Sequence, residues 1–268
     1  MKINYQKSND GNSKFIKIFI VTLIIATIGV VVFGKIRDKE VINQNKAAAE
    51  QIKNQLKNET QNQDKNVISL HKYEGKKWLA IGDSITYNDQ YQGKVVQLCK
   101  ISKVTTDAVP GQKLGTMADR LTKENLAGID LITIFGGTND YGGNKLLGTK
   151  EDDKTIDKFY GNIRKVIDKI QSLNSSAKIV FITPLKRGRF ENQPVYPESN
   201  KAGNKLEQYI QAIKYVCGEK SIQVIDLFND SGINENSLSQ YTTDNLNPNT
   251  AGYEKISQVI ANELENPK

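Results

Sequence analysis

The fold is decided by the stretch Trp78-Leu79-Ala80-Ile81-Gly82-Asp83-Ser84-Ile85-Thr86. Its first four residues are an uninterrupted apolar run, and Gly-Asp-Ser follows at once. Short apolar runs without polar alternation are typical of strands that are buried on both faces of a parallel sheet. We therefore predict a strand over Trp78–Ile81 that ends in a polar turn.

The same pattern, a short apolar run followed by Gly, Pro, Asn or Asp, recurs along the chain after residue 73. Between the runs, apolar residues repeat at helical spacing over 159–173, 206–216 and 256–264. This alternation predicts an α/β fold, a three-layer, doubly wound, five-stranded parallel sheet of the flavodoxin-like type. The other predicted strands are Val104–Val109, Ile129–Phe135, Lys178–Thr183 and Ile222–Leu227.

Three polar blocks follow strands of this sheet, where an open α/β sheet binds its ligand. They are Gly82-Asp83-Ser84, Gly136-Gly137-Thr138-Asn139-Asp140 and Asp244-Asn245-Leu246-Asn247-Pro248-Asn249. A turn or a helix cap explains each block equally well when it is taken alone. Together, and in this order, they are far more specific for a reactive site.

In this combination the blocks resemble the SGNH/GDSL hydrolase family of GDSL-like lipases and acylhydrolases, over residues 76–265 and in a bacterial branch. The resemblance implies that Ser84 attacks an ester carbonyl. It also implies an oxyanion hole made by the backbone N–H of Ser84, the backbone N–H of Gly111 and the side-chain amide of Asn139, with Gly115 as a weaker candidate for the glycine. No metal or organic cofactor is implied.

The last block departs from the family pattern, because the resemblance implies a histidine as general base, oriented by Asp244, and Asn247 stands in its place. A neutral amide has no basic nitrogen that could take the proton of Ser84. Two interpretations therefore stay open, an ester hydrolase and a catalytically silent site that binds an acyl or sugar group. Intact Ser84, Gly111 and Asn139 argue against a third, a purely structural surface protein.

Two other groups were candidates for the missing base. His71 is the single histidine of the chain. It precedes the first strand whereas Ser84 follows it, so we expect roughly 20 Å between them and regard His71 as a linker residue. Direct action of Asp244 is the other possibility, although an ordinary carboxylate is a weak base for this step.

An apolar span without charge, IFIVTLIIATIGVVVFG, covers residues 18–34. At 1.5 Å per residue it is roughly 26 Å long, close to the hydrocarbon thickness of a bilayer. No small-residue cleavage motif follows it, which favours an uncleaved transmembrane helix over a signal peptide. We predict a short tail over 1–17, a membrane anchor over 18–34, a polar helical or flexible stalk over 35–72 and the hydrolase-type domain over 73–268.

The orientation of this anchor does not follow from charge, because lysine and arginine flank both of its ends. The family resemblance instead implies a single-pass protein of the cell membrane with its large domain outside the cytoplasm. The expected partners are ester-bearing surface glycans or lipids.

Composition limits the other possibilities. The net charge is +7, but residues 1–69 hold 11 Lys and Arg against 6 Asp and Glu, so the folded part is nearly balanced. A nucleic-acid binder needs a basic surface on its folded domain, so we predict no nucleic-acid partner.

Cys99 and Cys217 fall on apolar helix stripes and are expected to be buried, with a disulfide between them left open. Residues 186–204, with Lys186, Arg187 and Arg189, are a candidate lid.

Overall fold

The computed structural model describes residues 50–54, 71–88 and 90–267. The chain divides into two units, residues 1–68 and 69–268. Residues 50–54 of the first unit are helical. The predicted anchor over 18–34 and most of the predicted stalk lie outside the described residues. Within the described ranges, no helix is both long and apolar enough to cross a membrane.

The second unit is built on a five-stranded sheet in the order β2-β1-β3-β4-β5. All four neighbouring pairs are parallel, which confirms the predicted sheet. The strand predicted from Ile129 begins two residues later, at Leu131. The carboxylate of Asp130, directly before it, accepts a hydrogen bond from the backbone N–H of Lys77. The strands are β1 (Lys77–Gly82), β2 (Lys103–Ala108), β3 (Leu131–Phe135), β4 (Lys178–Ile182) and β5 (Gln223–Ile225).

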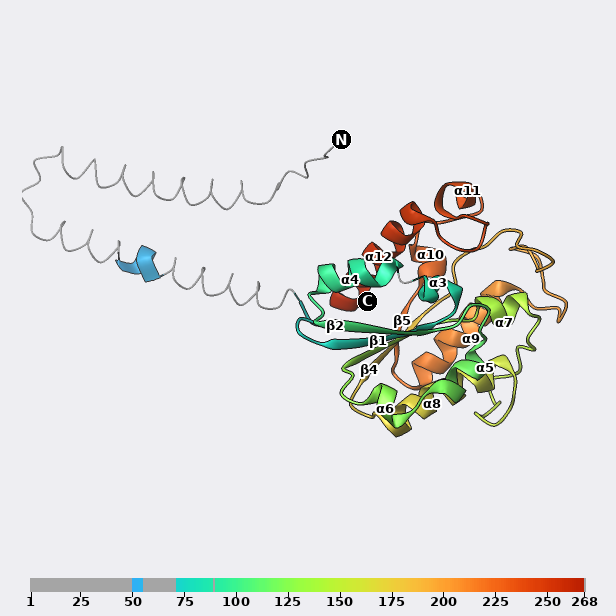
Figure 1. Cartoon of the computed structure of the whole chain (residues 1–268), viewed down its shortest axis with the longest axis horizontal. Helices are drawn as coiled ribbons and strands as arrows, with labels where there is room; N and C mark the ends of the chain where they lie inside the picture. Colours follow the sequence, from blue (N-terminus) through green and yellow to red (C-terminus); the bar gives the residue numbers. More distant parts are fainter. Residues whose placement is uncertain (1–49, 55–70, 89, 268) are drawn as a thin grey trace, which may run out of the picture. The chain divides into compact units, whose positions relative to one another are not determined.

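Helices cover both faces of this sheet, which gives the three layers (Figure 1). On one face lie α4 (Gln90–Cys99) and α12 (Thr250–Glu265), and on the other α8 (Phe159–Leu173) and α9 (Leu206–Glu219). The predicted helical stripes therefore correspond to α8, α9 and α12. The shorter helices are α3 (Ser84–Tyr87), α5 (Leu114–Met117), the 3-10 helix η1 (Ala118–Arg120), α6 (Lys123–Leu126), α7 (Thr138–Gly142), α10 (Leu227–Asp230) and α11 (Leu238–Tyr241).

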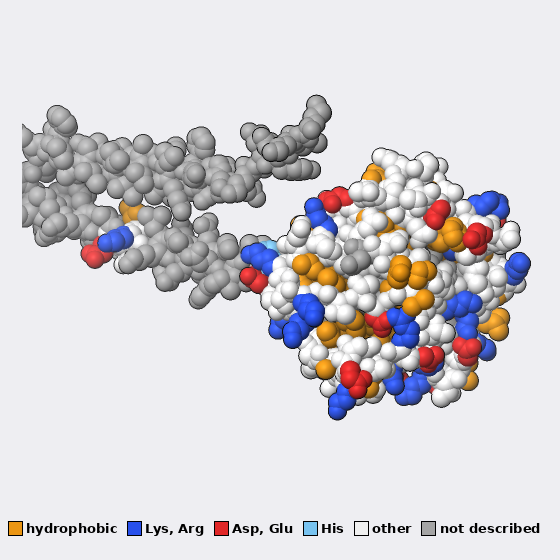
Figure 2. All heavy atoms as spheres, viewed as in Figure 1, with side chains coloured by type: hydrophobic (Ala, Val, Ile, Leu, Met, Phe, Trp, Pro, Cys, Tyr) orange, Lys and Arg blue, Asp and Glu red, His pale blue; other side chains and the backbone are white. Residues whose placement is uncertain are grey.

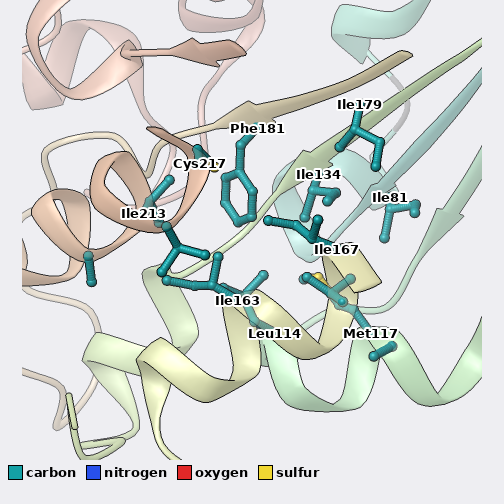
Figure 3. Close-up of a cluster of buried hydrophobic side chains, with 14 of the residues drawn as sticks. Ile81, Leu114, Met117, Ile134, Ile163, Ile167, Ile179, Phe181, Ile213 and Cys217 are labelled. Atoms are coloured by element: carbon teal, nitrogen blue, oxygen red, sulfur yellow. The ribbon is translucent and has the colours of Figure 1, made fainter. Parts of the chain in front are cut away.

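Each face of the sheet carries its own apolar core. Figure 3 shows Ile81, Ile134 and Phe181 of the sheet packed towards Ile163 and Ile167 of α8. All five side chains are at most 1% exposed, and full burial of a side chain of this size contributes about 1.5–3 kcal/mol. The period-3.6 stripe of α8 is thus explained by packing and carries no chemistry.

The opposite core contains Trp78 and Tyr91, whose ring centroids are 6.1 Å apart. The indole N–H of Trp78 donates to Thr133 Oγ1 at 2.9 Å, so this buried donor is satisfied. Cys99 and Cys217 are free thiols, both fully buried, one in each core. The prediction that they act as small apolar residues is confirmed, and they do not form a disulfide.

The surface of the second unit mixes charges of both signs. On the face drawn in Figure 2, Lys and Arg side chains are interspersed with Asp and Glu. This distribution agrees with the near balance of charge in the sequence after residue 69.

The turn after β1 is held by a close backbone approach at Gly82. A Cβ atom on Gly82 would overlap the side chain of Thr86 and lie 3.0 Å from the carbonyl oxygen of Phe135. From the opposite side the hydroxyl of Tyr253 on α12 donates to Ile85 O at 3.0 Å. The start of α3 therefore has a fixed position at the carboxyl end of the sheet.

We expect Gly82→Ala to lower the free energy of unfolding by about 1–3 kcal/mol, because neither the β-branched Thr86 nor the backbone of Phe135 can give way. The matched control is Gly93→Ala on α4, where a Cβ would meet nothing within 4 Å. This change should raise stability by roughly 0.5–1 kcal/mol through helix propensity. Urea denaturation of both variants measures the difference, and equal effects would contradict the packing account.

Candidate active site

The ends of three neighbouring strands bring two of the polar blocks and the segment after β2 together. Ser84 begins α3 directly after β1, and Asn139 lies in α7 directly after β3. The segment after β2 joins them, because Val109 N donates to Gly82 O at 3.2 Å and Asn139 Nδ2 donates to Gln112 O at 3.2 Å. Since β1 lies between β2 and β3, this is the point where the strand order reverses, at which open α/β sheets bind ligands.

A chain of side-chain hydrogen bonds runs from Ser84 through Asn247 to Asp244. Ser84 Oγ donates to Asn247 Oδ1 at 2.9 Å. Asn247 Nδ2 in turn donates to Asp244 Oδ2 at 2.8 Å. Residues 163 positions apart in the sequence thus meet at one edge of the sheet.

The polarity of this chain follows from Asp244. Its Oδ1 accepts the backbone N–H groups of Leu246 at 3.0 Å and Asn247 at 2.6 Å. A carboxylate only accepts hydrogen bonds, so the amide of Asn247 must turn its NH₂ group to Asp244 and its oxygen to Ser84. Ser84 is then left to donate its proton to Asn247, as a nucleophilic serine donates to a histidine.

The difference from a histidine is chemical. The hydrogen bond from Ser84 ends on an amide oxygen, which holds the hydroxyl in place but is far too weak a base to remove its proton. Ser84 itself is half-buried. The arrangement positions the hydroxyl of Ser84 without supplying a base that could activate it.

The two other predicted oxyanion donors lie in the turns after β2 and β3. Gly111 is exposed and adopts a φ of +75°, a left-handed conformation that favours glycine. Asn139 is 9% exposed, and both of its Nδ2 hydrogens have acceptors, Asp83 Oδ2 at 3.0 Å and Gln112 O at 3.2 Å. To bind an oxyanion, Asn139 must give up one of these two bonds.

Two carboxyl groups beside these residues are almost completely buried. Burial, with a smaller contribution from the nearby Asp140, raises the pKa of Asp83 to about 7 against an opposing hydrogen bond from Ile85 N. Burial also raises the pKa of Asp140 to about 6, against an opposing hydrogen bond from Leu114 N. Asp140 Oδ1 has no hydrogen-bond partner among the described residues. The sequence analysis did not single out either carboxyl group, although both stand inside the polar blocks.

His71 is not part of the site. It lies before the amino end of β1, where with Leu98 and the end of α12 it lines a surface cavity of about 290 Å³. Gly115 packs against α8, because a Cβ there would lie 2.9 Å from the side-chain amide of Asn162. Its weaker candidacy as an oxyanion donor stays a prediction.

The segment 186–204 does not present all its basic residues to a ligand. Arg187 is 1% exposed, and its guanidinium donates to Thr138 O at 3.3 Å and to Gln193 Oε1 at 2.7 Å. Asn200, also buried, donates to Tyr141 O at 3.1 Å. The interpretation of Arg187 as a lid contact is wrong, because burial and these bonds tie the segment to α7.

The sequence of this domain also matches a known protein family. The GDSL-like lipase/acylhydrolase family matches residues 80–255, about two thirds of the chain, with the β1 turn, the α7 turn and the last block inside the match. The chain belongs to this family. GDSL-like lipases and acylhydrolases act on ester substrates.

Solved structures agree in fold with this GDSL-family chain. A protein from Lactobacillus plantarum shares 23% identity over 73% of this chain and 99% of its own, with a TM-score of 0.65. A possible lipase from Chitinophaga pinensis shares 23% identity over 70% and 96%, with a TM-score of 0.57. A lipase/acylhydrolase from Enterococcus faecalis shares 20% identity over 72% and 98%, with a TM-score of 0.54. No curated protein matches the chain significantly in sequence.

Among the residues that the structure describes, no three His, Cys, Asp or Glu side chains are grouped so that they could hold a metal ion.

The buried carboxyl of Asp140 predicts a measurable link between pH and stability. Its pKa is raised in the folded state, so this group stabilises the fold below its unfolded pKa of about 4, and that contribution is lost as pH rises through about 6. Asp140→Asn removes the titrating group and keeps an oxygen for Leu114 N. The unfolding free energy of the variant relative to wild type should therefore increase from pH 4 to pH 7, as measured by urea denaturation. A difference that does not change with pH would contradict the assignment.

Proposed function

We propose that the chain is an ester hydrolase of low intrinsic turnover, anchored in the membrane by residues 18–34, that acts outside the cytoplasm. Ser84 is the nucleophile in this proposal. The backbone N–H groups of Ser84 and Gly111 and the side-chain amide of Asn139 stabilise the oxyanion. The substrates are O-acyl groups of surface glycans or lipid esters.

One observation carries the proposal, the continuous hydrogen-bond chain from Ser84 Oγ to Asn247 Oδ1 and from Asn247 Nδ2 to Asp244. It keeps the direction of the bonds in a serine hydrolase triad and lacks its base. In the subtilisin case, loss of the base costs about 10⁶ in kcat, yet roughly 10³ to 10⁴ over water remains from binding and the oxyanion hole. Slow hydrolysis is thus compatible with these residues.

A second function is favoured by the same substitution. If turnover is negligible, the site serves as a recognition module that binds an acyl or sugar group without cleaving it. The observation in its favour is the amide oxygen of Asn247, which cannot accept the Ser84 proton at neutral pH. The two functions differ in a single measurable quantity, the rate of ester cleavage.

Asn247→His separates the two. An imidazole at this position can take the Ser84 proton, and Asp244, which already accepts from residue 247, orients it. We expect hydrolysis of p-nitrophenyl acetate by the full chain to rise by a factor on the order of 10³ or more. The control is Asn247→His with Ser84→Ala, in which the gain should disappear.

Two outcomes would contradict the proposal. Wild-type turnover at ordinary esterase rates that is abolished by Ser84→Ala would reveal another base. Absence of any gain in Asn247→His, with the fold intact, would favour recognition over catalysis.

The membrane topology is tested separately. The span 18–34 has no charge and no cleavage motif after it, and the proposal therefore expects an intact single-pass protein. Added protease should digest the domain over 73–268 on intact cells. Full protection in sealed cells, with digestion only after lysis, would refute the orientation.

A further inference from the structure

Asp83 connects the two halves of the site, although no step of the proposed reaction uses it. Its Oδ1 accepts the backbone N–H of Ile85 at 3.1 Å and so caps α3, the helix that begins with Ser84. Its Oδ2 accepts the amide of Asn139 on α7 at 3.0 Å. Asp83 is 1% exposed, so both bonds are shielded from water.

Two of the three proposed oxyanion donors need such a connection. The backbone N–H of Ser84 belongs to the turn after β1, whereas the Asn139 amide belongs to the turn after β3. Donors stabilise a developing oxyanion only when they are held in place beforehand, about 3 Å from one point. The carboxyl of Asp83 bonds to both turns and fixes their separation.

The second hydrogen of Asn139 points to the ligand position. It donates to Gln112 O at 3.2 Å, a longer bond to a neutral carbonyl, while the bond to Asp83 is 3.0 Å and is charge-assisted when Asp83 is ionised. The bond to Gln112 is therefore the weaker one, and a substrate oxyanion would replace that carbonyl. Asp83 keeps Asn139 oriented during the exchange.

We propose that Asp83 is a positioning residue of the oxyanion hole, which holds the amide of Asn139 on one carboxylate oxygen and the first turn of α3 on the other. The proposal rests on the proposed function, in which Asn139 and Ser84 stabilise the oxyanion. It adds a residue that touches neither the substrate nor the nucleophile's hydroxyl.

The charged and titratable groups around Asp83 make the strength of its hydrogen bond from Asn139 dependent on pH. Asp140 on α7 disfavours its ionisation, Arg187 from the segment after β4 favours it, and Tyr253 approaches from α12. The segment after β2 contributes the neutral Gln112. Because burial raises the pKa of Asp83 to about 7, the carboxyl gains its charge near neutral pH. Its bond to Asn139 then strengthens as pH rises through that value.

The first test observes Asn139 directly in the wild-type full chain in detergent, labelled with ¹⁵N-asparagine. This site contains no histidine, so no imidazole obscures the titration. The side-chain NH₂ signal of Asn139, assigned by its loss in Asn139→Ser, should titrate with a midpoint near 7. Asp83→Asn should abolish the titration, and Asp140→Asn should move the midpoint to lower pH because it removes a neighbouring negative charge.

The second test measures kinetics in the Asn247→His background. Asp83→Asn offers one acceptor oxygen in place of two, so it must lose either the α3 cap or the Asn139 bond. We expect kcat to fall by about 10²–10³, the cost of one oxyanion donor, with KM little changed. The matched control is Asp140→Asn, a buried carboxyl that accepts from Leu114 N instead, and it should keep kcat within a few-fold.

The outcomes separate the two proposals. An inactive Asn247→His variant would count against the proposed function, while the NMR titration would still decide whether Asp83 holds Asn139. An active Asn247→His variant whose kcat is unchanged by Asp83→Asn would overturn the positioning role alone. A flat Asn139 signal from pH 5 to 9, or an unshifted midpoint in Asp140→Asn, would overturn it as well.

Discussion

The carboxylate of Asp244 can only accept hydrogen bonds, and this constraint determines the direction of the bonds that connect it through Asn247 to Ser84. It binds two backbone N–H groups of its own loop and the NH₂ group of Asn247. The oxygen of Asn247 is thereby turned to Ser84, whose hydroxyl must donate. An asparagine thus reproduces the hydrogen bonds of a catalytic histidine and omits its basic nitrogen.

The parallel sheet explains why these residues meet at all. The carboxyl ends of adjacent parallel strands lie at the same edge of the sheet. The strand order β2-β1-β3 therefore brings the turns after these three strands next to one another. Close packing at Gly82 and the bond from Tyr253 then fix the nucleophile turn. Asp83 and Asp140 are buried beside the site, and their burial raises the pKa of both carboxyl groups.

Much of this architecture was predictable from sequence. Apolar runs such as Trp78–Ile81 indicate strands clearly because a strand that is buried on both faces consists mostly of apolar residues, and the helical stripe of α8 has one buried face. The distance of His71 from Ser84 followed from strand length. Two features were not predictable. From the sequence alone Arg187 is expected at the surface, because its partner on α7 is not known. The role of Asp83 depends on a hydrogen bond from Asn139, which lies 56 residues away in the sequence.

The central claim is that the hydroxyl of Ser84 is held by Asn247 without a base. It is tested most directly by the rate at which a fluorophosphonate labels Ser84 in the wild-type full chain between pH 8 and 10. Without a base that titrates below this range, deprotonation of the Ser84 hydroxyl depends on hydroxide. The account therefore predicts a labelling rate that keeps rising from pH 8 to pH 10. A rate that is constant from pH 8 to 10, and is lost in Ser84→Ala, would show a fully ionised general base and would contradict the account.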